Sequence, residues 1–136
     1  MRVTGTGISM NVADVAASSH FLREHFGFSE AMSADGFASL VREDVGASVI
    51  FLRCGLATLP ADQRDDHASG LILAFEVEDL EGELARLRAE GVTITMPLTS
   101  EEWGERAFQV RDPNGMIVQL VDWNASSPDR SASTDG

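Results

Sequence analysis

Few side chains in this chain are suited to catalysis, and their spacing assembles no familiar reaction centre. The sequence contains no Lys, which excludes Schiff-base and catalytic-lysine chemistry. Cys54 stands alone in an apolar strand-like run, where a small core residue is expected rather than a nucleophile. His20 and His25 are five residues apart on a predicted helix and so point about 140° apart, whereas His67 stands in a predicted loop. No motif supports a Ser-His-Asp, Cys-His or phosphate-loop site.

Gln119 is the polar side chain on which most of the functional question depends. It stands in the stretch VRDPNGMIVQLVDW, which reads as a tight turn followed by an apolar strand. Alternation along that strand places Gln119 on one face together with Ile117 and Val121. Three roles are open for it: a hydrogen-bonding group in a ligand pocket, a metal ligand, or a polar strand residue that faces solvent or a satisfied backbone group.

The helices that must position these side chains occur as a repeat. The stretches VADVAASSHFLREHFGF and VEDLEGELARLRAEGV both read as strand, Asp cap, helix and Gly stop. Asp14 and Asp79, 65 positions apart, are placed to accept from the free N–H groups of each first turn. Gly27 and Gly91 supply the left-handed residue that ends each helix. The apolar spacing predicts two main helices, near residues 14–26 and 80–90.

Strand-like runs follow each helix, and here too the halves correspond. They are GFASLVRED and ASVIFLRC in the first half, and GVTITMP, RAFQVRDP and MIVQLVDW in the second. An offset of 69 aligns Val41 with Val110 and Gly46 with Gly115. The pattern predicts an α+β fold of two βαβββ modules that pack together, because one small module cannot bury its own sheet face. We expect a single domain over residues 4–124, with modules at about 4–56 and 70–124, and a disordered Ser-rich tail at 125–136.

Composition and charge limit the classes of partner. The chain has 136 residues, of which 43% are hydrophobic and 24% charged, which is ordinary for one globular domain. No apolar run reaches about 18 residues and the start lacks a secretory signal, so we expect a cytoplasmic protein without a membrane span. A net charge of −12 repels nucleic acid and anionic lipid, and it favours a cationic ligand. The same acidity is also typical of a charge that serves only solubility.

The repeated modules, the V-x-D before each helix, the run FLREHFGF and the VRDPNG before the last strand resemble the vicinal oxygen chelate superfamily. The resemblance covers about residues 4–124. That superfamily includes glyoxalase I, bleomycin resistance proteins, extradiol dioxygenases and fosfomycin resistance enzymes. The resemblance implies a glyoxalase/bleomycin-resistance-type pair of half-barrels. It leaves the function open, because this fold hosts several chemistries as well as pure binding.

Metal-dependent members of that superfamily hold one divalent ion with two His, Glu or Gln side chains from each module. In this sequence the first-strand position falls on Gly7, and its repeat equivalent is Ile72. The last-strand position falls on Gln119, and its repeat equivalent is Ile50, or Phe51 if the register slips by one. Glycine and isoleucine offer no side-chain lone pair, and a lone amide is a poor ligand for a transition ion. We expect neither a metal nor another cofactor, and a cleft lined by these positions with Gly7 at its floor.

The stretch TSEEWGERAFQVRDPNG supplies candidate aromatic residues for such a cleft. Bleomycin resistance proteins have a similar Gly-x-Arg-x-Phe-x-Val-Arg-Asp-Pro stretch, matched here over residues 104–113, although Ala107 replaces the family's Glu before the Phe. Trp103, in a loop beside two Glu residues, suits stacking on a flat cationic or aromatic ligand, and it suits equally well a cover for the edge of the core. We predict that Trp103 stacks on the ligand, Phe108 forms a wall and Gln119 fixes its orientation.

Three functions compete for this sequence. We favour a metal-free small-molecule binding protein without catalytic residues, and antibiotics are one ligand class that it could sequester. The alternative is a glyoxalase-type lyase or isomerase, or a dioxygenase, that uses one divalent metal. The third is a non-enzymatic partner module with a vestigial pocket. The duplicated module and an apolar edge expected around Trp123 predict a homodimer, and whether modules pair within one chain or across the dimer stays open.

Overall fold

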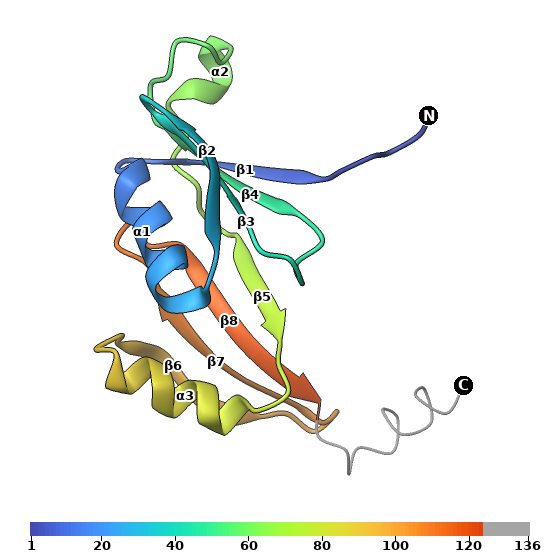
Figure 1. The fold of residues 1–136 in the computed structure, drawn as a ribbon. Coiled ribbons are helices and arrows are strands. Elements are labelled where there is room, and N and C mark those ends of the chain that lie inside the picture. The colour runs from blue at the N-terminus through green and yellow to red at the C-terminus, as the bar shows by residue number, and fades with distance from the viewer. Residues whose placement is uncertain (124–136) are drawn as a thin grey trace. The chain divides into compact units, whose positions relative to one another are not determined.

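The structure is a computed structural model that describes residues 1–123. The tail predicted to be disordered, residues 125–136, lies outside the described residues. In chain order the elements are β1 (Gly7–Val12), α1 (Val15–Phe26), β2 (Ser29–Ala34), β3 (Phe37–Val41), β4 (Ser48–Arg53), α2 (Ala61–Arg64), β5 (Ile72–Glu76), α3 (Leu80–Ala89), β6 (Ile94–Ser100), β7 (Glu105–Arg111) and β8 (Ile117–Trp123) (Figure 1).

The chain divides into two compact units, and each contains one βαβββ module. The first unit is Met1–Gly70 together with Asp112–Asn114, and the second begins with Leu71–Arg111 and resumes at Gly115. The first module is β1 to β4 with α1, and the second is β5 to β8 with α3. The predicted α+β fold of two βαβββ modules is therefore confirmed, in the form of two four-stranded mixed sheets.

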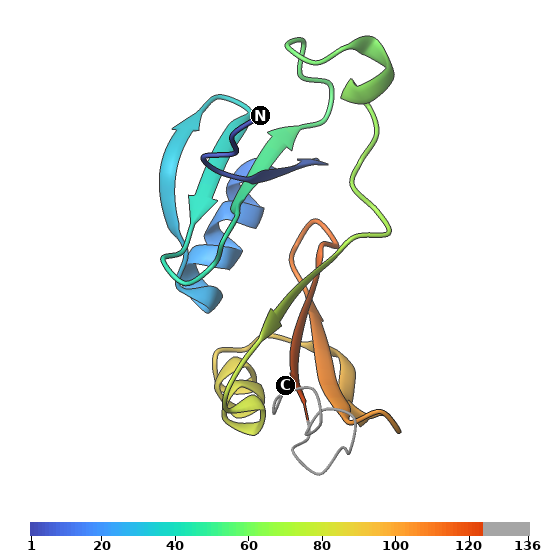
Figure 2. The same ribbon diagram turned by 90° about the vertical axis from the view of Figure 1, so that its right-hand side faces the viewer.

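The first module packs α1 against one side of its sheet (Figure 2). Its strands lie in the order β1-β4-β3-β2, with β1 parallel to β4 and the other neighbours antiparallel. Because side chains alternate along a strand, the sheet has a helix face beneath α1 and an open face that α1 does not cover. The helix face buries Met10, Val12, Ala38, Leu40, Val49 and Phe51.

The second module repeats this plan with α3. Its strands lie in the order β5-β8-β7-β6, and β5 runs parallel to β8. Its buried helix face is formed by Phe108, Val110, Val118 and Leu120, and α3 contributes Leu80 and Leu87. The alternate residues of β7 and β8, with odd numbers, form the open face of this second sheet.

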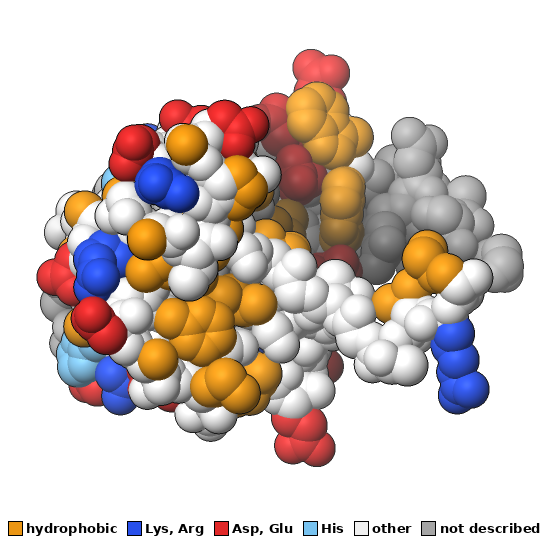
Figure 3. Space-filling model, turned by 90° about the horizontal axis from the view of Figure 1, so that it is seen from above, with side chains coloured by type: hydrophobic (Ala, Val, Ile, Leu, Met, Phe, Trp, Pro, Cys, Tyr) orange, Lys and Arg blue, Asp and Glu red, His pale blue; other side chains and the backbone are white. Residues whose placement is uncertain are grey.

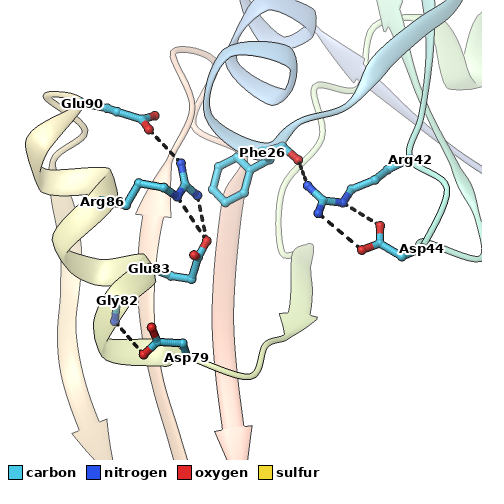
Figure 4. Close-up of polar contacts among 8 residues, drawn as sticks. All are labelled: Phe26, Arg42, Asp44, Asp79, Gly82, Glu83, Arg86 and Glu90. Atoms are coloured by element: carbon cyan, nitrogen blue, oxygen red, sulfur yellow. Dashed lines mark hydrogen bonds and ion pairs between the residues drawn. The ribbon is translucent and has the colours of Figure 1, made fainter.

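The two main helices begin and end close to the positions predicted from the sequence. The side chain of Asp14 accepts a hydrogen bond from the backbone N–H of Ala17 at 3.1 Å, and Asp79 accepts one from Gly82 at 3.1 Å (Figure 4). Gly27, with φ of 68°, ends α1 in the left-handed conformation. The capping logic that predicted helices near 14–26 and 80–90 is confirmed. No helix within residues 1–123 is long and apolar enough to cross a membrane.

The turn between β7 and β8, predicted from its Asp-Pro-Asn-Gly sequence, belongs to the first unit and caps the start of α1. Asn114 accepts a hydrogen bond from the backbone N–H of Asp14 at 3.0 Å, and its Nδ2 donates to the Asp14 carbonyl at 2.7 Å and to Ser18 Oγ at 2.7 Å. Ser18 donates in turn to Asp112, and both side chains are buried. The conformation of this turn therefore depends on groups about 100 residues away in the sequence.

Two features depart from the sequence expectation. The edge strand β2 was not among the strand-like runs, because every residue of SEAMSA is exposed and no apolar alternation marks it. The repeat also shifts by one residue in β3. Leu40 pairs with Val49 as Val110 pairs with Val118, so Leu40, and not Val41, is the equivalent of Val110. The shift arises because the segment between the paired residues is one residue longer in the first module, residues 41–48, than in the second, residues 111–117.

Candidate functional site

Gln119 lies on the open face of the second sheet, and its side chain is paired with that of Gln109. The two residues face each other across the β7–β8 ladder. Gln109 Nε2 donates to Gln119 Oε1 at 2.8 Å, and both side chains are half-buried. Among residues 1–123, the structure gives these two side-chain amides no other hydrogen bond. Each amide therefore keeps hydrogen-bonding capacity for a further partner.

The surroundings of this amide pair are mostly apolar. In the row across the sheet, Ala74 of β5 stands beside Gln119 and Met96 of β6 beside Gln109. The neighbouring residues of β8 on the same face are Ile117 and Val121. In its own row the linked amide pair is flanked by aliphatic side chains, while Arg111 and Glu76 lie on the same face one row away on either side.

Ile72, a predicted lining residue, stands on this open face and is 49% exposed. It pairs with Ile117, one step along the β5–β8 ladder from the pair of Ala74 with Gln119. Because Ile72 and Ala74 are two residues apart in one strand, their side chains share a face. The structure therefore brings Ile72 and Gln119 together on one surface, as the repeat predicts.

Phe108 does not join them. We expected it to form a wall of the same cleft as Gln119, but Phe108 pairs with Leu120 on the helix face and is fully buried. Gln109, the next residue, carries the open-face position instead. The difference arises from strand alternation, which sends adjacent side chains to opposite faces of the sheet.

Trp103 lies in the turn between β6 and β7 and is 55% exposed. The turn is closed by hydrogen bonds between Glu101 N and Glu105 O and between Gly104 N and Glu101 O, at 2.8 and 3.0 Å. Gln109 lies four positions after Glu105 in β7, which corresponds to about 13 Å along the strand. A ligand that touches both Trp103 and the amide pair must therefore be extended.

The corresponding face of the first sheet carries Gly7 and Ile50. The ladder pairs Ser9 with Ile50 on one side and Ser39 with Ile50 on the other, so Ile50 is the structural equivalent of Gln119. Phe51, the other possible equivalent, is fully buried on the helix face. A Cβ atom added at Gly7 would lie 3.1 Å from Ile50 Cδ1, so the end of the Ile50 side chain would have to shift slightly to admit a side chain at position 7.

The residues present do not fit the divalent metal that the superfamily resemblance implies. In the first module, neither Gly7 nor Ile50 has a side-chain donor atom. In the second, Gln119 already accepts a hydrogen bond through its Oε1 atom, the atom that would bind an ion, and Ile72 has no donor atom. Among the described residues, no three His, Cys, Asp or Glu side chains are grouped as a metal site requires.

A second hollow, of about 580 Å³, lies between the start of α1 and the β2–β3 hairpin of the first module. Its carboxylates already have partners. Asp14 caps α1, Glu30 accepts from Ser19 Oγ at 2.6 Å, and Asp35 pairs with Arg53 at 2.9 Å. The pKa values of Glu30 and Asp35 are lowered by these hydrogen bonds. The polar groups of this hollow are satisfied internally, which makes it a weaker candidate than the amide pair.

Charged side chains lie at several places on the face of the molecule seen in Figure 3. Acidic side chains are scattered among exposed hydrophobic ones in the view of Figure 3. The Arg of the bleomycin-resistance-like stretch, Arg106, pairs with Asp122 at 2.5 Å and with Glu81 at 2.7 Å. Hydrogen bonds to these carboxylates, first Asp122 and then Glu81, raise the pKa of Arg106, and the bond to Arg106 lowers that of Glu81. Arg106 thus joins β7, β8 and α3.

Sequence reasoning missed Gln109 as a partner of Gln119. The signal was present: the predicted turn makes β7 and β8 a hairpin, and counting outward from its two ends places residue 109 opposite residue 119. The count needs the size of the turn, which the sequence motif alone leaves uncertain by one residue.

Comparison with known proteins agrees with this architecture. The family model described as Glyoxalase/Bleomycin resistance protein/Dioxygenase superfamily matches residues 6–120. No curated protein matches the chain. A glyoxalase/bleomycin resistance protein/dioxygenase from Nocardioides is similar in structure, with a TM-score of 0.74, 21% identity, and coverage of 94% of this chain and 89% of that one.

Two further solved structures carry more specific names. TnmS3, an antibiotic binding protein from Streptomyces sp. CB03234, is similar with a TM-score of 0.69 and 21% identity over 91% of this chain and 99% of that one. A lactoylglutathione lyase from Agrobacterium tumefaciens is similar with a TM-score of 0.71 and 15% identity over 89% and 94%. At these identities the likeness concerns the fold alone.

Proposed function

We propose that this chain, which belongs to the Glyoxalase/Bleomycin resistance protein/Dioxygenase superfamily, is a metal-independent small-molecule binding protein. Its ligand lies on the open face of the second sheet, over Gln119 and Ile72. On the open face of the first sheet, Ile50 holds the position equivalent to Gln119 and is the proposed ligand contact of that face. Phe108 contributes from beneath, because its burial keeps β7 and β8 in the register that presents the amide pair.

The observation that carries the proposal is the state of Gln119. A metal ligand would keep its oxygen free for the ion, whereas Gln119 Oε1 is engaged by Gln109 at 2.8 Å. Ligand pockets are typically apolar surfaces with a small number of placed polar groups that fix orientation. The amide pair between Ile72, Ala74, Ile117 and Val121 has this composition.

The position of Trp103 constrains the ligand further. An exposed indole at the end of the same module suits stacking with a flat aromatic or cationic ring, and the net charge of −12 favours a cation. A molecule that reaches from Trp103 to the amide pair spans on the order of 15 Å at strand spacing, which is the length of a compound with several fused or linked rings. Antibiotic natural products fall in this class, and the antibiotic binding protein among the structural relatives supports the proposal.

The proposal also covers the extent of the functional domain and its assembly into a dimer. Residues 4–124 act as one functional domain, in a cytoplasmic homodimer. The family fold, built of modules with one uncovered sheet face each, supports a dimer in which the open faces gain cover. Sedimentation showing only monomer at high micromolar concentration would contradict this part of the proposal and leave ligand binding to be tested separately.

A thermal-shift screen tests the function. Purified protein is mixed with a library of aromatic, cationic and antibiotic compounds, once with a chelator and once with Ni²⁺, Zn²⁺, Mn²⁺ or Fe²⁺. We expect compounds that raise the melting temperature equally in both sets. Stabilisation only in the metal set, or stoichiometric metal in the purified protein, would favour the glyoxalase-type lyase, isomerase or dioxygenase. An absence of any stabilising compound would favour a partner module with a vestigial pocket.

A further inference from the structure

We infer that the Gln109–Gln119 pair recognises a neutral ligand group in which a hydrogen-bond donor stands next to an acceptor, as in a lactam or a primary carboxamide. The inference rests on the proposed function, since it names the chemical class of ligand for the same open face. It also assigns a ligand-contacting role to Gln109, which the sequence motifs do not single out.

The hydrogen-bonding inventory of the pair leads to this class. A glutamine amide has two N–H donors and one oxygen acceptor. With Gln109 Nε2 donating to Gln119 Oε1, the oxygen of Gln109 and the amino group of Gln119 stay available on the open face. The pair therefore presents an acceptor on one residue and a donor on its neighbour.

Neighbouring side chains favour a neutral partner over an ion. The residues beside the pair in the same row of the sheet are Ala74 and Met96, and neither carries a charge. The charged residues of this face, Arg111 and Glu76, stand one row away on opposite sides of the pair and have opposite signs. A ligand ammonium or carboxylate over the pair would lose water without meeting an opposite charge in its own row, which is unfavourable. A lactam loses little, because its N–H and C=O replace water at the amides one for one.

Covering the pair with a ligand that lacks these groups is penalised. A buried donor or acceptor left without a partner costs more than a hydrogen bond gains, so sites that hydrogen-bond their ligands reject analogues without the matching group. We expect a lactam to bind on the order of ten- to a hundredfold more tightly than a hydrocarbon of the same shape. An analogue with an acceptor alone should lie between the two.

Bicyclic aromatic probes of one size test this directly. We would titrate the protein with 2-quinolinone, which has adjacent N–H and C=O groups, with quinoline, which has an acceptor only, and with naphthalene. Affinities come from calorimetry, and ¹⁵N side-chain amide resonances from NMR show where each probe binds. The expected result is the order 2-quinolinone, quinoline, naphthalene, with the resonances of Gln109 and Gln119 shifting most.

Three variants separate recognition from folding. The double variant Gln109→Met/Gln119→Met keeps side-chain length and removes both amides, so it should lower the preference for 2-quinolinone over naphthalene to less than about threefold, since no amide remains to match the lactam. Gln63→Met makes the same chemical change at an exposed residue of α2 in the first module and should leave the preference intact. Gln119→Glu replaces the available donor with a carboxylate and should shift the preference toward 2-aminoquinoline.

Each outcome bears on one claim. Equal affinity of the wild type for 2-quinolinone and naphthalene, or unshifted Gln109 and Gln119 resonances at millimolar 2-quinolinone, would overturn the inference even if other compounds bind the open face. A preference that survives both Met substitutions would overturn it as well. Failure of the proposed function is a different result, in which no compound of the wider screen stabilises the protein.

Discussion

The open faces of the two sheets are built on the same register but carry different chemistry. In the first module the middle row runs Ser9, Ile50 and Ser39; in the second the same row runs Ala74, Gln119 and Gln109. An aliphatic side chain flanked by small hydroxyls corresponds to two linked amides flanked by aliphatic groups. On the helix faces, by contrast, equivalent buried residues of the two modules are both apolar, as Phe51 and Leu120 are.

This contrast shows where the repeat is constrained. A side chain on the helix face must fill space beneath a helix, so any polar or smaller replacement costs packing energy. A side chain on the open face is constrained only by what later covers it. The two modules could therefore diverge there without loss of stability, and this divergence supports the proposal that function resides on the open face.

The largest expected effect is on the free energy of unfolding, and it comes from a substitution on the helix face of the first module. Phe51→Ala removes a fully buried ring and should lower the free energy of unfolding by about 3–5 kcal/mol. Ile50→Ala, its neighbour on the open face, should cost well under half as much because Ile50 is only half-buried. Urea denaturation of both variants measures the difference. Equal losses would mean that the open face of the first module is as tightly packed as its core.

The second effect compares the two hairpin turns. The side chain of Asn114 makes three hydrogen bonds to Asp14 and Ser18, and its replacement leaves the Asp14 backbone N–H and C=O and the buried Ser18 hydroxyl without this partner. Asn114→Ala should therefore destabilise the protein by about 2–3 kcal/mol. In the turn of the first module, Asp44 is exposed and pairs with Arg42, whose guanidinium also donates to the Phe26 carbonyl (Figure 4). Asp44→Ala should leave the unfolding midpoint unchanged, and a comparable loss there would contradict the contrast.

Much of the fold follows from local sequence signals, and the candidate site follows only in part. Asp14 and Gly27 fixed the limits of α1 because a cap acts on residues within one helical turn. Ile50 and Gln119 were equivalent as predicted because the offset of 69 holds between β4 and β8, although β3 and β7 are offset by one residue more. Phe108 was assigned to the wrong face of the sheet, and Gln109 was overlooked. Which residues of two strands face each other depends on the register of the hairpin, and one extra residue in the turn changes that register.

The next effect concerns ligand affinity on the open face of the second module. For a compound found by the thermal-shift screen, Trp103→Ala should weaken binding by about 1–3 kcal/mol through the loss of a stacking partner. Gln119→Ala should cost about 1 kcal/mol, the net value of one neutral hydrogen bond. Calorimetric titration of both variants provides the numbers. If Trp103→Ala left the affinity for every such compound untouched, the β6–β7 turn would be structural.

The smallest effect concerns acid stability in the first module. Hydrogen bonds from Ser19 and Ser33 lower the pKa of Glu30 below its ordinary value of 4.5. A lowered pKa in the folded state gives stability above the ordinary value, which is lost as the pH falls through the folded-state pKa. Glu30→Gln should therefore be less stable than the wild type at pH 7, and the difference should shrink below pH 4. A difference that stays constant from pH 7 to pH 3 would contradict this origin.

The central claim is that the open face of the second sheet binds a small molecule without a metal. Its most direct test is the dissociation constant of one stabilising compound, measured by calorimetry after exhaustive chelation and again with equimolar Ni²⁺ or Zn²⁺. The account predicts the same dissociation constant in both conditions, a clear loss of affinity in Gln119→Ala, and no such loss in Gln63→Met. Binding that disappears on chelation and returns with one equivalent of metal would contradict it.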